Sequence, residues 1–125
     1  MHRARQVLQR VFARRAAHGR PARRDLAALD ALLADTLTHL ELRPSVSGTE
    51  LGWRGLATEL EGPLWPVVWS AARLLTSEEA ARIRRCAGPE CGWMYVDRSR
   101  NGLRRWCEMD TCGMREKNRR RAGAR

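Results

Sequence analysis

The sequence lacks the features of a membrane or exported protein. No apolar run approaches the roughly 20 residues that span a bilayer. The longest candidate, Leu64 to Leu75, is interrupted by Pro66 and Arg73. The first 24 residues contain no apolar signal-peptide core. We therefore expect a soluble, cytoplasmic protein with no membrane partner.

Motifs of catalysis are missing as well. The three histidines, His2, His18 and His39, have no partner residues at a catalytic spacing. No glycine-rich phosphate loop and no nucleophile motif appears in the chain. We expect that the protein is not an enzyme.

Acidic residues are absent from residues 1–24, which carry eight arginines. The segment charges are +8 for residues 1–24, −3 for residues 25–85 and +5 for residues 86–125, within a net charge of +10. Positive charge at both ends of the sequence favours a polyanionic partner. The alternative is codon usage in a GC-rich genome, because Lys117 is the one lysine among 24 basic residues.

Apolar periodicity predicts three helices in residues 1–85. The first covers residues 4–17 and ends before Gly19 and Pro21. The second starts at Asp25 as a cap and stops at Pro44, because the residue before a proline is disfavoured in a helix. The third opens at Gly62-Pro63 and continues to Leu75. Their apolar faces contain Val7, Leu8, Val11, Phe12, Leu26, Leu29, Leu33, Leu37, Leu40, Leu64, Trp65, Val68, Ala72 and Leu75.

Two shorter features complete this half. Residues 45–54 predict an extended segment, a turn at Ser47-Gly48-Thr49 and a second extended segment. Thr76 and Glu79 have the spacing of a capping box, which predicts a short helix ending at Arg85.

The cysteines are confined to the last 40 residues, as two C-x4-C pairs separated by fifteen residues: Cys86, Cys91, Cys107 and Cys112. This pattern favours one tetrahedral Zn²⁺. Four thiolates fill the coordination shell, so the ion would be structural. The alternatives are two disulfides, an iron–sulfur cluster or four unconnected thiols. The cytoplasm disfavours disulfides because it keeps thiols reduced.

The chain between the cysteine pairs contains Asn101-Gly102, a strong signal for a hairpin turn that would return Cys107 beside Cys91. Cys112 would lie near the start of a C-terminal helix. The fold class expected is mainly α with a small β-hairpin. It combines a helical part, residues 1–85, with a treble-clef-like four-cysteine finger, residues 86–125.

Aromatic residues occur in both halves. We expect Trp93, Tyr95 and Trp106 to pack over the cysteines rather than to stack on bases. We expect Trp53, Trp65 and Trp69 to belong to the core of the helical part.

Three segments resemble a known family. CGWMYVDRSRNG at residues 91–102, RRWC at 104–107 and CGMR at 112–115 resemble the CGNR zinc finger. That finger is the C-terminal module of bacterial ABATE-domain proteins, which are described as stress-induced transcription regulators. LGW at 51–53, LWPV at 64–67 and LLT at 74–76 resemble the later part of the ABATE domain. Met114 replaces the family asparagine, and residues 1–85 look like an N-terminally shortened domain.

The resemblance implies DNA binding and regulation of transcription, with a helical part that dimerises or senses an effector. The alternative is a zinc-stabilised protein–protein interaction module without sequence-specific DNA binding; a weaker one is association with RNA. Arg115 and Arg119 are four residues apart and share a helical face, although basic residues at a helix end also suit its dipole. The expected nucleic-acid contacts are Arg98, Arg100, Arg104, Arg105, Arg115, Lys117, Arg119, Arg120 and Arg121.

Overall fold

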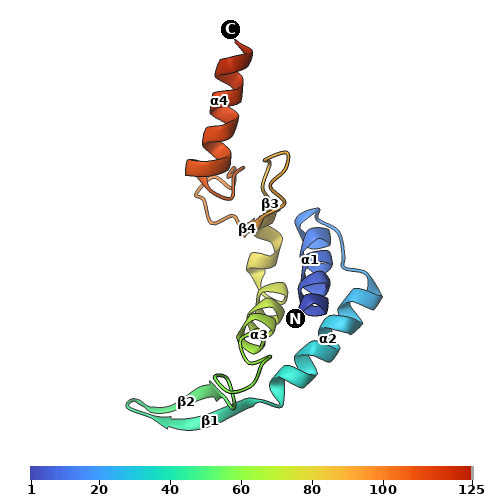
Figure 1. Ribbon diagram of the computed structural model, residues 1–125, viewed down its shortest axis with the longest axis vertical. Helices are drawn as coiled ribbons and strands as arrows, with labels where there is room; N and C mark the ends of the chain where they lie inside the picture. Colours follow the sequence, from blue (N-terminus) through green and yellow to red (C-terminus); the bar gives the residue numbers. More distant parts are fainter. Residues whose placement is uncertain (125) are drawn as a thin grey trace. The chain divides into compact units, whose positions relative to one another are not determined.

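The computed structural model describes residues 1–124 (Figure 1). Helices dominate, and the strands form two antiparallel hairpins, which confirms the expected fold class. The elements in chain order are α1 (His2–Ala16), α2 (Arg23–Leu37), β1 (Leu40–Ser45), β2 (Gly48–Trp53), α3 (Leu64–Leu75), the 3-10 turn η1 (Glu78–Arg82), β3 (Ile83–Arg85), β4 (Met94–Val96), the π-helical turn η2 (Met109–Gly113) and α4 (Met114–Gly123). Within residues 1–124, none of the helices is long and apolar enough to cross a membrane.

The chain divides into two compact units. The first consists of Met1–Val11 and Pro21–Ser77, and the second consists of Phe12–Arg20 and the chain from Glu78 onward. Each unit is described separately below.

The core of the first unit contains side chains from α1, α2 and α3. Val7, Val11, Leu29 and Val68 are almost fully buried and pack together. They belong to the predicted apolar faces, whereas Leu26 and Leu37, expected on the same faces, are 44% and 38% exposed. Trp65 is also buried, and the ring of His39 stacks on it at a centroid distance of 3.8 Å.

The start of α2 differs from the prediction. The helix begins at Arg23, and Asp25 lies in its first turn rather than at the cap. Asp25 is buried, and its Oδ1 accepts a hydrogen bond from Arg10 Nε at 2.8 Å. Arg10, fifteen residues earlier in the sequence, therefore binds the carboxylate of Asp25, which the sequence predicted as the cap of the helix.

The end of α2 also differs. The helix stops at Leu37, and Leu40, expected on its apolar face, begins β1 and pairs with Trp53 of β2. Residues 40–45 form backbone hydrogen bonds with β2. The chain therefore continues as a strand, although the leucine spacing predicted that the helix would extend to Leu40. The predicted extended–turn–extended segment is present as this β1–β2 hairpin. The hairpin starts five residues earlier than expected, because it includes residues 40–44, and it turns at Val46-Ser47, so that Gly48 and Thr49 of the predicted turn belong to β2.

The expected capping box does not form. Thr76 follows the last residue of α3, and its hydroxyl donates to the carbonyl of Ala72 at 3.0 Å. The next helical turn is η1, which stops at Arg82, and residues 83–85 form β3 instead of continuing the helix. Antiparallel pairing of Ile83 with Val96 in β4 explains this early stop.

The hairpin of the second unit is formed by β3 and β4, and it precedes Asn101-Gly102, where the sequence predicted the hairpin turn. Those two residues do form a turn, with Gly102 at a φ of 66° and its N–H donating to the Ser99 carbonyl at 3.3 Å. Among the described residues, however, no strand follows this turn, and β4 pairs with β3. The segment that joins β3 to β4 contains the first two cysteines.

Candidate metal centre

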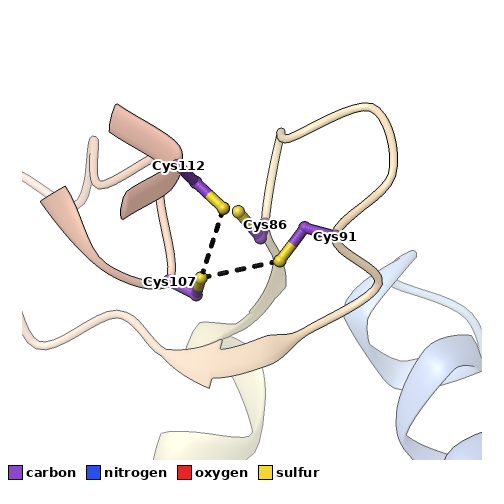
Figure 2. Close-up of side chains that lie close together, drawn as sticks. All are labelled: Cys86, Cys91, Cys107 and Cys112. Atoms are coloured by element: carbon purple, nitrogen blue, oxygen red, sulfur yellow. Dashed lines mark hydrogen bonds between the residues drawn. The ribbon is translucent and has the colours of Figure 1, made fainter. Parts of the chain in front are cut away.

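The four cysteines meet at one point of the second unit (Figure 2). The Sγ atoms of Cys86, Cys91, Cys107 and Cys112 all lie within 4.8 Å of one another. Cys107 Sγ lies 3.6 Å from Cys91 Sγ and 3.7 Å from Cys112 Sγ. A disulfide joins its sulfurs at about 2.05 Å, so these are four separate thiols.

The β3–β4 hairpin positions the first pair. Cys86 directly follows β3, and its N–H donates to the carbonyl of Trp93 at 2.8 Å. The chain then turns, and Cys91 N–H donates to the carbonyl of Gly88 at 3.2 Å. Gly88 N–H in turn points to Cys86 Sγ at 3.4 Å. This tight loop brings both thiols to the same side of the hairpin.

Backbone contacts and a helical turn position the second pair. The N–H of Ala87 donates to the carbonyl of Arg105 at 2.9 Å and ties the segment before Cys107 to the first loop. Cys112 lies in η2, which continues directly into α4. The return of Cys107 to Cys91, expected from a second strand, is achieved by these irregular contacts.

Two glycines next to the cysteines escaped the sequence reasoning. A Cβ at Gly88 would lie 3.1 Å from Cys91 Cβ and 3.3 Å from Cys112 Sγ. A Cβ at Gly113 would clash with Met109 Sδ and lie 3.2 Å from Trp106 Cδ1. A side chain at position 88 would therefore make its neighbours shift by a few tenths of an ångström, and one at position 113 would make the Met109 side chain move. The position of each glycine, two residues after Cys86 and one after Cys112, was the only available signal.

The buried carboxylate of Asp97 organises the next turn. Its Oδ1 accepts hydrogen bonds from the backbone N–H of Ser99, at 2.9 Å, and from the Ser99 hydroxyl. These bonds, led by the one from the hydroxyl, hold the pKa of Asp97 below its ordinary value. Asp97 is therefore a structural residue of the segment between β4 and Cys107.

The surroundings of the thiols shift their pKa values in opposite directions. Burial raises the pKa of Cys86, but backbone hydrogen bonds from Cys107 and Gly88, together with bonds to neighbouring thiols, lower it overall to about 7. Burial and the neighbouring thiols raise the pKa of Cys107 to about 12. The thiol of Cys91, followed by burial, raises the pKa of Cys112. A metal ion at this site would displace protons, so its affinity would fall in acid.

The sulfur spacing fits a tetrahedral metal ion. With metal–sulfur bonds of about 2.3 Å, as for zinc, the sulfurs at the corners of a tetrahedron are about 3.8 Å apart. The observed 3.6 and 3.7 Å lie close to this value. The four-sulfur donor set suits a soft or borderline cation.

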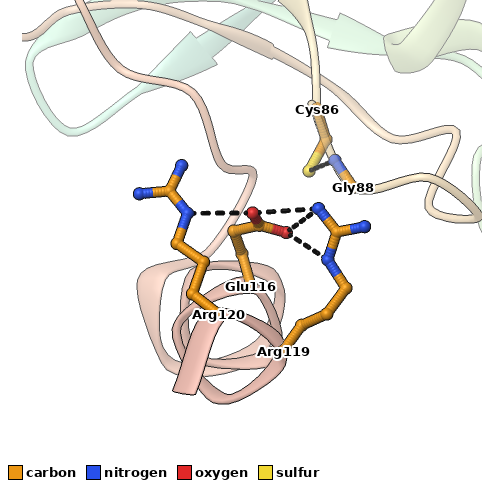
Figure 3. Close-up of polar contacts among 5 residues, drawn as sticks. All are labelled: Cys86, Gly88, Glu116, Arg119 and Arg120. Atoms are coloured by element: carbon orange, nitrogen blue, oxygen red, sulfur yellow. Dashed lines mark hydrogen bonds and ion pairs between the residues drawn. The ribbon is translucent and has the colours of Figure 1, made fainter. Parts of the chain in front are cut away.

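Four of the nine basic residues expected to contact nucleic acid have partners within the protein. Arg98 Nε pairs with Glu79 at 2.7 Å. Arg104 donates to the carbonyls of Trp106 and Cys107, and its guanidinium lies 4.3 Å from the centre of the Tyr95 ring. The other two, Arg119 and Arg120, form ion pairs with Glu116 (Figure 3).

The side chains of the remaining five basic residues are more available to a nucleic-acid partner. Arg105 lies over the ring of Trp106, at 5.0 Å from its centre. The other four have no ion pair or side-chain hydrogen bond among residues 1–124: Arg100, Arg115, Lys117 and Arg121. All five side chains are exposed.

The aromatic residues of the second unit differ in burial. The hydroxyl of Tyr95 donates to the carbonyl of Arg104 at 2.6 Å, and Trp106 is half-buried. Trp93, expected to pack over the cysteines, is 67% exposed. That expectation is wrong for Trp93, because only its backbone carbonyl is needed to hold Cys86.

Comparison with known protein families separates residues 1–78 from residues 82–124. No match is found among curated proteins. A family model described as "CGNR zinc finger" matches residues 82–124. The model of the ABATE domain, described as "Putative stress-induced transcription regulator", matches residues 1–78, more than half of the chain. The chain therefore belongs to the ABATE family, and its C-terminal part is a CGNR zinc finger.

Proposed function

We propose that Cys86, Cys91, Cys107 and Cys112 bind one structural Zn²⁺. The meeting of the four Sγ atoms within 4.8 Å of one another, with two of their separations at 3.6 and 3.7 Å, carries the proposal. When bound, the ion would link the β3–β4 loop to the start of α4 and supply folding free energy to a unit with few buried side chains. Four thiolates leave no position for water or substrate, so we assign the ion no catalytic role.

Metal analysis of the purified protein tests this part. Elemental analysis is expected to find one zinc per chain and no iron. A colourless protein would agree, because iron–thiolate centres absorb visible light. Stoichiometric iron, or a protein that folds equally well after treatment with a chelator, would contradict the proposal.

We further propose that the zinc finger binds DNA and that the protein regulates transcription. Four exposed cations of the second unit, Arg100, Arg115, Lys117 and Arg121, have no partner among residues 1–124 and are available to phosphates. The family description supports the same function. With four phosphate contacts, affinity would fall about 100-fold between about 50 and 200 mM salt.

The experiment is selection of the zinc-loaded protein on a random DNA duplex pool at about physiological salt, followed by sequencing of the retained DNA. An enriched motif and the expected salt dependence would support a sequence-reading regulator. A salt-insensitive interaction, or no retention of DNA, would refute DNA binding.

A second candidate function is a protein-interaction module. Leu42, Val46 and Leu51 of the β1–β2 hairpin are 73%, 110% and 58% exposed, and exposed apolar side chains of this kind are typical of contact surfaces. Substitution of Leu42 and Leu51 by serine separates the two functions. Loss of a partner or of self-association with unchanged DNA binding would assign the hairpin to protein contacts.

A further inference from the structure

Helix α4 is unusual because none of its ten residues is buried. A rise of about 1.5 Å per residue makes it roughly 15 Å long. An amphipathic helix usually buries an apolar stripe against its own protein. The side chains of α4 are instead free to contact a partner on most of their surface.

Glu116 divides this helix into two sides. Its side chain is only 13% exposed and accepts hydrogen bonds from two arginines (Figure 3). Arg119 Nε and Nη2 donate to its two carboxylate oxygens, each at 3.0 Å, and Arg120 Nε donates at 3.1 Å. The bonds from Arg119, followed by those from Arg120, lower the pKa of Glu116, so it is ionised at neutral pH. Two of the helix cations are thus partly neutralised.

The opposite side contains Met114, Lys117, Asn118 and Arg121. The spacing i, i+3, i+4, i+7 places these residues on one continuous stripe. All four are exposed, and among residues 1–124 none has an ion pair or a side-chain hydrogen bond. The stripe contains two cations, one amide, one apolar side chain and no carboxylate. We call it the open stripe.

We propose that the open stripe enters the major groove of DNA, with Asn118 reading a base and Lys117 and Arg121 contacting phosphates. This inference rests on the proposed DNA-binding function. The major groove, about 12 Å wide, admits one α-helix, and an asparagine amide forms two hydrogen bonds with adenine. Two unpaired cations complement the charge of the duplex, whereas on the other side Glu116 offsets the charge of one of its two arginine partners. Met114 can contact a thymine methyl group.

A pair of double variants tests the orientation of the helix in the zinc-loaded full chain. Lys117→Gln with Arg121→Gln removes two charges from the open stripe. Arg119→Gln with Arg120→Gln removes two charges from the other side and is a stringent control, because it also leaves Glu116 unpaired. Circular dichroism and zinc content establish that both variants are folded.

The open-stripe variant is expected to reduce the slope of log affinity against log salt by about two, whereas the control changes it by less than one. Asn118→Ala is expected to lose discrimination at one base pair of the selected motif by roughly 5- to 150-fold. Its affinity for a scrambled duplex should not change.

Several results would overturn the inference. An equal or larger slope change in the control would place the other side of α4 on the DNA. Unaltered discrimination by Asn118→Ala would remove its role in reading bases. Preference for duplex RNA over DNA would also contradict it, because the A-form major groove is too narrow for a helix. A wild-type protein that binds no DNA would refute the proposed function itself, and the inference with it.

Discussion

Gly88→Ala tests the geometry of the metal centre with a single methyl group. The backbone of Gly88 is not in the left-handed region, so alanine meets no conformational obstacle. Its Cβ, however, would lie 3.1 Å from Cys91 Cβ and 3.3 Å from Cys112 Sγ. These contacts are several tenths of an ångström shorter than ordinary carbon–carbon and carbon–sulfur contacts. At least one ligand must therefore move.

The neighbours must give by a few tenths of an ångström, and we expect this shift to disturb the ligand geometry. Metal–ligand distances in well-formed sites stay within about 0.2 Å of their ideal values. Overpacking by one methyl group costs about 1–3 kcal/mol, which corresponds to a metal affinity weaker by about 5- to 150-fold. We would measure zinc transfer from the protein to a chromogenic chelator and compare the competition curves of the variant and the wild type.

Gly123→Ala is the matched control, because a Cβ at Gly123 has no neighbour within 4 Å. It adds the same methyl group to the same unit and should leave the chelator curve unchanged. If Gly88→Ala also leaves the curve unchanged, the added methyl group at position 88 does not displace the cysteines, and the steric argument fails.

Three further predictions concern the metal and the core. Cys107→Ser removes one thiolate and should release the ion and unfold the second unit; stoichiometric zinc in a folded variant would show that the centre does not need this ligand. Leu29→Ala leaves a cavity in the buried core and should destabilise the first unit by about 2–5 kcal/mol in denaturant unfolding. Leu60→Ala, at a position that is 83% exposed and outside the β1–β2 hairpin, is its control and should change stability by less than about 0.5 kcal/mol. Asp25→Ala removes the acceptor of the Arg10 hydrogen bond and should cost about 1.5–3 kcal/mol, whereas an unchanged melting temperature would show that the pair contributes little.

The helices of the first unit were predictable because their apolar residues recur with the helical period. Val7, Val11, Leu29 and Val68 form the core that this period indicated. The ends of the elements were less predictable. Leu40 continues the leucine pattern of α2 but pairs with Trp53 in a hairpin, because backbone pairing with a distant strand is invisible to a local pattern.

The cysteine cluster was predictable from spacing alone. Its scaffold was not, because Asn101-Gly102 forms a turn without flanking paired strands, while β3 and β4 are too short to give a periodic signal. The steric need for Gly88 beside Cys112 also appears only once the two loops are brought together.

The sequence by itself determined the donor set of the metal centre and the excess of positive charge, because both follow from residue type and spacing. Only the tertiary structure decided which cations of the β4–Cys107 segment are held by distant partners. Arg98 is nineteen residues from its partner Glu79, and Arg104 is nine residues from Tyr95, over whose ring its guanidinium lies. Ion pairing depends on distance in space and on side-chain direction, and neither is fixed by the order of residues along the chain.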